Sequence, residues 1–196
     1  MKYATTIASS IGFAALYLGC MNTSGAESTS VYSIVAEIPG AGGAWDYAVI
    51  DVPAERLYLA QGGVTALDLK TNKLTTTLVA GKETHGVTVL GEGLVAVDDS
   101  ASKTVKVFDG ASDKIVATIP TAQDNPGKGH LALDATVLEP KSGLVVAING
   151  DSGLLVLIDI KQAKVAGTIV IGGNPEYAAA DGKGTLYVNV NRGKIE

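Results

Sequence analysis

Cysteine and aromatic side chains are scarce in this chain of 196 residues, and each scarcity excludes a class of architecture. A single cysteine excludes any disulfide within the chain, and therefore a disulfide-stapled scaffold. Aromatic residues make up only 5% of the sequence, whereas glycines number 24. This balance favours short strands joined by tight turns over long helices. Because a chain of this length can bury a substantial core without cross-links, we expect an all-β fold.

Basic residues are also few, and they are scattered singly along the chain. The formal net charge is −5, with 15 Lys and Arg against 20 Asp and Glu. A surface that binds nucleic acid needs clustered cations that replace the counterions of the phosphates. The sequence therefore argues against a nucleic-acid partner.

Residues 1–26 have the pattern of a secretory signal peptide. Lys2 forms a minimal positive region, residues 4–18 are largely apolar, and small residues up to Ala26 provide a cleavage site before Glu27. The alternative is a membrane anchor, but this apolar run contains Ser and Thr and is shorter than the ~20 apolar residues that span a bilayer. We expect a periplasmic or extracellular protein without a transmembrane span in the mature chain.

A second processing route is also open, because residues 16–20 partly match a bacterial lipoprotein box. In that route Cys20 would carry the lipid, although Tyr17 stands where the box usually has leucine. If cleavage follows Ala26 instead, Cys20 leaves with the leader and the mature chain has no thiol.

A motif of a hydrophobic residue, Asp, four residues and Lys recurs three times, each time before a β-branched run. Each copy predicts a strand, a turn closed by the Asp side chain, and a second strand. The Asp and Lys pairs are Asp68 and Lys73, Asp109 and Lys114, and Asp159 and Lys164.

Two further strands are predicted before each hairpin, which gives about four strands per repeat at a spacing of roughly 41 to 50 residues. That spacing is typical of β-propeller blades, whereas the β-branched content argues against helix-pair repeats. We predict a partial propeller over residues 27–196, with one additional strand over residues 31–37. The predicted blades are residues 45–79, 85–120, 130–170 and 176–196, about three and a half in all.

An incomplete last blade would leave apolar edges exposed, so we expect this chain to be a truncated copy of a longer propeller. Two alternatives stay open at this stage. The chain could form a small closed ring, or it could be a half that assembles with another copy.

Three segments resemble the YncE-like, YVTN-type family of exported β-propeller proteins. They are the hairpin VKVFDGASDKIVATIP, the blade opening THGVTV, and GGNPEYAAADGKGTLYVNV with its Asp-Gly-Lys-Gly turn. The resemblance runs from about residue 43 to the end, and residues 121–130 depart from it by being longer than their counterparts. It implies a seven-bladed ring, of which this chain would be an incomplete part, and it implies export rather than a particular activity.

Four titratable residues stand at equivalent positions, at or just before the first strand of each blade: Asp46, His85, His130 and Glu176. Because first strands face the propeller axis, these side chains are candidates for a ligand site at one mouth of the channel. Carboxylate and imidazole groups bind metals or cationic ligands. The alternative is that they satisfy backbone donors at strand starts or hold water.

Aromatic residues next to this register could stack on a ligand, and Trp45 and Tyr47 are the candidates; filling of the core is the alternative. Metal bonds are only ~2.0 to 2.2 Å long, so a ring of blade starts suits a hydrated ligand better than direct coordination by all four side chains. No cofactor and no particular metal is predicted.

The motifs of common catalytic sites are absent or in the wrong context. Residues 150–153, Gly-Asp-Ser-Gly, match a protease nucleophile loop but lie between two predicted strands, where they suit a turn. The Gly-rich loop at residues 40–43 precedes no helix and so lacks a phosphate-binding amide array. No catalytic residue is therefore predicted.

These features favour an exported binding or interaction module that presents its propeller face or channel mouth to a small molecule or a protein. One alternative is a metal- or quinone-dependent hydrolase or dehydrogenase with its site at that mouth. Another is a structural or redox-accessory protein of the cell envelope.

Overall fold

The computed structural model describes residues 32–121, 132–191 and 194–195, so the leader, Cys20 and His130 lie outside the described residues. The chain divides into two compact units, Met1–Glu37 and Ile38–Glu196. No helix among the described residues is long and apolar enough to cross a membrane.

The strand predicted over residues 31–37 is not formed in the part of it that is described. Residues 32–37 have no regular secondary structure, and no β-ladder of the described chain includes them. Large apolar side chains such as Ile34 and Val35 are exposed there. A β-strand requires a neighbour to pair its backbone N–H and C=O groups, so the alternating pattern alone does not produce one.

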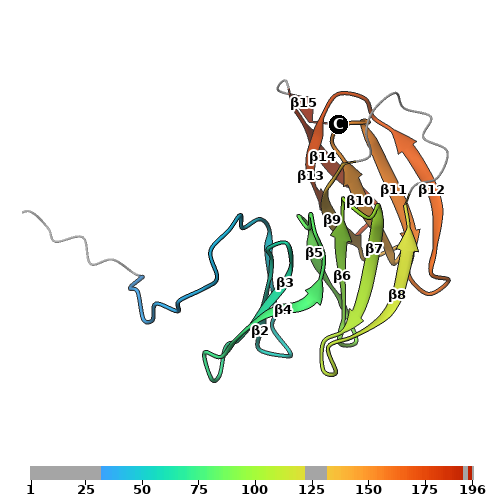
Figure 1. Ribbon diagram of the computed structural model, residues 1–196. Helices are drawn as coiled ribbons and strands as arrows, with labels where there is room; N and C mark the ends of the chain where they lie inside the picture. The colour runs from blue at the N-terminus through green and yellow to red at the C-terminus, as the bar shows by residue number, and fades with distance from the viewer. Residues whose placement is uncertain (1–31, 122–131, 192–193, 196) are drawn as a thin grey trace, which may run out of the picture. The chain divides into compact units, whose positions relative to one another are not determined.

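The second unit consists of antiparallel sheets that follow one another along the chain (Figure 1). Each of the first three sheets has four strands in sequence order, and the fourth has three. The first sheet contains β1 (Ala48–Asp51), β2 (Arg56–Ala60), β3 (Gly63–Asp68) and β4 (Leu74–Ala80). The second contains β5 (Val87–Gly91), β6 (Leu94–Asp99), β7 (Thr104–Asp109) and β8 (Lys114–Pro120). The third contains β9 (Leu133–Glu139), β10 (Leu144–Asn149), β11 (Leu154–Asp159) and β12 (Lys164–Val170), and the fourth β13 (Pro175–Ala180), β14 (Leu186–Val190) and β15 (Lys194–Ile195).

The predicted Asp-closed turns connect the third and fourth strands of the first three sheets. The Asp68 carboxylate accepts a hydrogen bond from the Thr71 N–H at 2.8 Å, and Asp109 accepts one from the Ser112 N–H at 2.7 Å. Asp159 closes the third turn in the same way. These hydrogen bonds favour the ionised form and hold the pKa values of Asp68 and Asp109 below the ordinary value of an aspartate. The recurring Asp motif therefore marks a structural turn.

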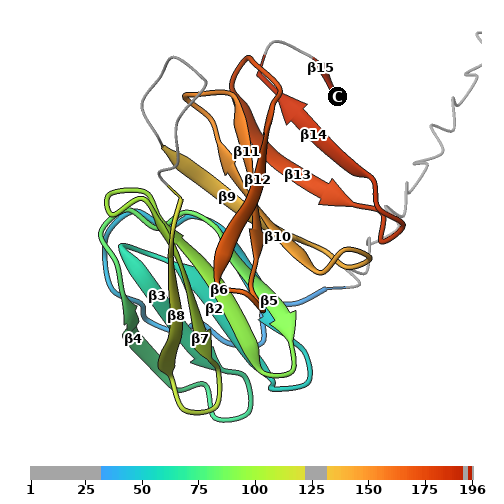
Figure 2. The same ribbon diagram turned by 90° about the vertical axis from the view of Figure 1, so that its right-hand side faces the viewer.

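Successive sheets pack face to face through apolar side chains, and Figure 2 shows the first two sheets stacked in this way. Val64, Val79 and Tyr58 of the first sheet contact Val95 and Phe108 of the second in one buried cluster. A second cluster joins the second and third sheets, and a third joins the third and fourth. The core thus lies between sheets, and each sheet is stabilised by its neighbours.

The first strands of successive sheets contact one another: β1 contacts β5, β5 contacts β9, and β9 contacts β13. At one of these contacts the Thr88 hydroxyl lies 2.8 Å from the Thr136 hydroxyl. Gly86, immediately before β5, lies against β9, where a Cβ would collide with the backbone of Ala135 and Thr136. Close approach of β5 to β9 therefore requires glycine at this position.

The predicted fold class is confirmed: the described chain is all-β, with three four-stranded sheets and part of a fourth, as expected for an incomplete β-propeller.

Replacement of Phe108 by alanine tests the packing between the first two sheets. Its ring is fully buried and meets the Tyr58 ring edge-on, with centroids 5.5 Å apart. We expect Phe108→Ala to lower the free energy of unfolding by about 3 to 5 kcal/mol, because it removes buried area and leaves a cavity. Urea denaturation followed by fluorescence measures the change. The exposed Val116 on β8 is the control, and Val116→Ala should cost less than about 1 kcal/mol.

Candidate functional site

Three of the five residues predicted for the ligand site line one pocket: Trp45, Asp46 and His85. The His85 Nδ1 lies 2.7 Å from the Asp46 Oδ2, so the imidazole N–H donates to the carboxylate. The pocket has a volume of about 520 Å³. The segments that precede β1 and β5 therefore lie together and form one polar pocket, called the hollow below.

Backbone hydrogen bonds hold this hollow in place. The Asp46 N–H donates to the Ala60 carbonyl at 3.0 Å, and the Tyr47 N–H donates to the His85 carbonyl at 3.2 Å. The Gln61 side-chain amide donates to the Ala41 carbonyl at 2.8 Å and ties down the Gly-rich loop. Residues 41–43 thus form one wall of the pocket.

A buried carboxylate, Asp98 on β6, lies directly behind His85. It accepts hydrogen bonds from the backbone N–H groups of His85 and Gly86 at 2.7 and 2.8 Å. Burial nevertheless raises the pKa of Asp98 to about 7. Sequence reasoning missed this residue, although an acid within the apolar run of a strand is a signal of a buried polar function.

The charge of Asp98 also acts on His85. Burial disfavours the imidazolium, but the hydrogen bond with Asp46 and the negative charge of Asp98 outweigh that effect, so the pKa of His85 is raised. His85 is therefore held toward its protonated form between two carboxylates.

A further acid, Asp134 on β9, was also missed by sequence reasoning. Its carboxylate accepts a hydrogen bond from the Gly150 N–H at 2.9 Å. Burial raises the pKa of Asp134, and the negative charges of Glu176 and Asp151 add to this effect. The third sheet thus contributes a carboxylate from within its first strand.

Tyr47 and Tyr177 stack on each other beside these acids, with ring centroids 5.1 Å apart and planes inclined by 29°. Tyr47 immediately precedes β1, whereas Tyr177 belongs to β13 in the fourth sheet. Both line a cavity of about 240 Å³ between the first strands β1, β5 and β9. Burial raises the pKa of Tyr47, and the charges of Asp46 and Glu176 raise it further. Tyr177, a partner of Tyr47, was not predicted from the sequence.

The predicted residues are therefore only partly assembled. Glu176 is exposed on β13, and its negative charge raises the pKa values of Tyr47 and Asp134. His130 lies outside the described residues. Within the described ranges, no group of three His, Cys, Asp or Glu side chains is arranged to hold a metal ion.

The Gly-Asp-Ser-Gly segment forms the turn between β10 and β11, as the sequence indicates. The Gly153 N–H donates to the Gly150 carbonyl across this turn, and Ser152 donates its backbone N–H to the Asn149 side chain.

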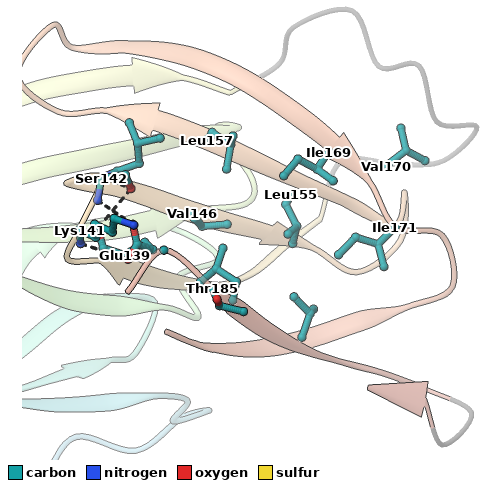
Figure 3. Close-up of a pocket in the computed structure, with 14 residues that line it drawn as sticks. Glu139, Lys141, Ser142, Val146, Leu155, Leu157, Ile169, Val170, Ile171 and Thr185 are labelled. Carbon is teal, nitrogen blue, oxygen red and sulfur yellow. Dashed lines mark hydrogen bonds between the residues drawn. The ribbon is translucent and has the colours of Figure 1, made fainter. Parts of the chain in front are cut away.

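A larger cavity, of about 720 Å³, lies away from these residues, between the third and fourth sheets (Figure 3). Its floor is apolar and includes Leu155, Leu157 and Ile169. Its lining has no aromatic side chain and has Glu139 and Lys141 as its charged groups, whereas Trp45, Asp46 and His85 meet in the pocket around His85, which is therefore the candidate site.

The raised pKa values of His85, Asp98 and Asp134 all make the free energy of unfolding depend on pH in the same direction. Each group binds its proton more tightly when folded, so the free energy of unfolding should fall as pH rises, for Asp98 between about pH 4 and 7. We expect a loss of the order of 2 kcal/mol between pH 5 and 8 in urea denaturation.

Asp98→Asn should flatten this dependence, because the amide does not titrate, while costing about 1 kcal/mol through one lost acceptor. Glu92→Gln, at an exposed turn, should keep the parental pH profile. An unchanged pH profile in Asp98→Asn would contradict the assignment.

Comparison with solved structures supports the fold. The chain matches the WD40 β-propeller domain of Doa1 with a TM-score of 0.62 and 12% identity, over 77% of this chain and 49% of that one. It matches hydrazine synthase of Kuenenia stuttgartiensis with a TM-score of 0.65 and 15% identity, over 81% of this chain and 45% of that one.

The chain thus spans about half the length of each of these structures. No protein-family model and no curated protein sequence matches it. At such low identity the likeness concerns the fold alone. Together with the sheets described above, it shows that the described residues from Ala48 to Ile195 form part of a β-propeller.

Proposed function

We propose that this chain is an exported β-propeller module that binds a small organic cation at the channel mouth. The observation that carries the proposal is the combination of the stacked Tyr47 and Tyr177 rings with the carboxylates of Asp46 and Glu176. The negative faces of aromatic rings attract cations, and nearby carboxylates strengthen that attraction. The groups come from different sheets, as in sites that enclose a ligand.

The electrostatics of the site favour a positive ligand. The negative charges of Asp46, Glu176 and Asp134 each raise the pKa of Tyr47. His85 is the only histidine among the described residues, and it offsets part of this charge. A bound ammonium group would relieve the repulsion between the carboxylates, which an anionic or neutral ligand would not.

Export is proposed from the leader pattern of residues 1–26, and membership of the YncE-like set is proposed from the repeats named above. The net charge of −5 is compatible with a cationic ligand and argues against phosphate-bearing polymers.

Calorimetric titration of the full chain with tetramethylammonium and with spermidine tests this function. We expect saturable binding at or below about 1 mM, which Tyr177→Ala weakens by about tenfold, because one face of the aromatic pair is lost. Asp46→Asn should weaken it similarly.

Tyr187 is the matched control, because it is exposed on β14 and does not line the cavity between β1, β5 and β9. Tyr187→Ala should leave affinity unchanged within about twofold. No saturable heat with either cation, or equal losses in the Tyr177→Ala and Tyr187→Ala variants, would rule the proposal out.

A further inference from the structure

His85 and Asp46 form an ion pair in the hollow, and this pair occupies a carboxylate that a cationic ligand needs. The His85 Nδ1–H donates to the Asp46 Oδ2 at 2.7 Å. The two side chains are 35% and 41% exposed, and both line the pocket of about 520 Å³. A protonated imidazole is thus a built-in cation that competes with a ligand for Asp46.

Hydrogen bonds on both sides fix the backbone of His85. Its N–H donates to the Asp98 Oδ1 at 2.7 Å, and its carbonyl accepts the Tyr47 N–H at 3.2 Å. Asp98 is fully buried, and its second oxygen accepts the Gly86 N–H at 2.8 Å. Gly86 lies so close to the backbone of β9 that a Cβ would collide with it. The buried acid, the histidine and Tyr47 therefore form one closely held series of hydrogen bonds.

This series reaches the aromatic pair of the proposed cation site. Tyr47 stacks on Tyr177, with ring centroids 5.1 Å apart. Asp46, which accepts the imidazole N–H, directly precedes Tyr47 in the chain. An imidazolium on Asp46 therefore cancels part of the negative charge that would attract a ligand cation to these rings.

Acidic groups predominate around the imidazole. The charged and titratable groups around it are Asp46 and Tyr47 before β1, Lys82 and Glu83 between β4 and β5, Asp98 on β6, Asp134 on β9, Asp151 after β10 and Glu176 on β13. Burial disfavours the imidazolium, but the hydrogen bond with Asp46 and the negative charge of Asp98 outweigh burial and raise the pKa of His85. Because burial raises the pKa of Asp98 to about 7, His85 and Asp98 titrate together near neutral pH.

We infer that binding of an organic cation in this site expels one proton from His85, so that the propeller exchanges a proton for its ligand. The inference rests on the proposed cation-binding function and adds its regulation by pH. When the ligand enters, the imidazolium releases one proton to the solvent, and the neutral imidazole keeps an N–H on Asp46. The carboxylate charge then attracts the ligand, and the net charge of the site is unchanged.

Proton affinity and ligand affinity are linked reciprocally. A cation that lowers the proton affinity of His85 is itself bound more weakly by the protonated form, and by the same factor. The association constant should therefore rise by about tenfold from about pH 5.5 to about pH 8, and it should level off at higher pH, where the imidazole is neutral.

Calorimetric titration of the full chain with tetramethylammonium measures the exchanged proton. This probe has no ionisable N–H, so a proton that appears on binding comes from the protein. The binding enthalpy is compared at about pH 6.5 in phosphate and in ACES buffers, which differ in their enthalpy of ionisation. We expect a release of about 0.5 to 1 proton for each cation bound.

His85→Gln keeps a side-chain donor for Asp46 but does not titrate. We expect this variant to lose at least about half of the proton release, and to bind the cation as tightly at about pH 6 as the parent does at about pH 8. Asp98→Asn removes the charge that favours the imidazolium, so the rise in affinity should move to lower pH. The control is Glu92→Gln, at an exposed turn that lines neither the hollow nor the cavity beside Tyr47, and it should keep the parental proton release.

Nuclear magnetic resonance of the imidazole Cε1–H provides a second measurement that needs no variant. The chain has two histidines, and the His85 signal is assigned through its backbone. Saturating tetramethylammonium should lower the titration midpoint of His85 by about one pH unit.

Three results would overturn the inference and leave the proposed function standing: binding without buffer-dependent heat, a proton release that His85→Gln leaves unchanged, or a His85 midpoint that does not move at saturation. Absence of binding even at about pH 8, where the imidazole is neutral, would overturn the proposed function and this inference together.

Discussion

Face-to-face packing of neighbouring sheets is the constraint on which this structure depends. Central strands such as β6 and β10 are buried along nearly their whole length, so each sheet has two apolar faces. No such sheet can leave both faces in water, and each therefore requires a neighbour on either side. Val95 and Val105, both without exposed surface, lie on opposite sides of the second sheet, one toward the first sheet and one toward the third.

The same packing determines where polar groups must gather. Stacking brings the first strands together, and their starts need acceptors for backbone N–H groups that no ladder pairs. The second strand of three sheets supplies one: Asp98 for His85 and Gly86, Asn149 for Ala132, and Asn189 for Tyr177. Asp98 is the carboxylate among these acceptors, and its pKa is raised by burial and, to a smaller extent, by the negative charge of Asp134. The candidate site thus arises because the starts of the first strands lie near one another and need hydrogen-bond acceptors for their backbone N–H groups.

The contact between the third and fourth sheets has a different character. Ala178 of β13 and Val188 of β14 pack on the third sheet, and an apolar groove lies beside this cluster. The groove and the site around His85 follow from one architecture, but they differ in chemistry. The groove offers apolar area and backbone groups, whereas the site offers charge and aromatic faces.

By itself the sequence determined the strands, the Asp-closed turns and the repeat, because alternation and turn chemistry act over a few residues. It also indicated that Asp46 and His85 lie near each other, since equivalent positions in a repeat meet at one end of the sheets. Only the tertiary structure decided that Asp98 and Asp134 stand beside them, that Tyr177 stacks on Tyr47, and that residues 32–37 form no strand. Those outcomes depend on which sheet lies against which and on which strand finds a partner, and such contacts join residues far apart in the chain, where no local pattern records them.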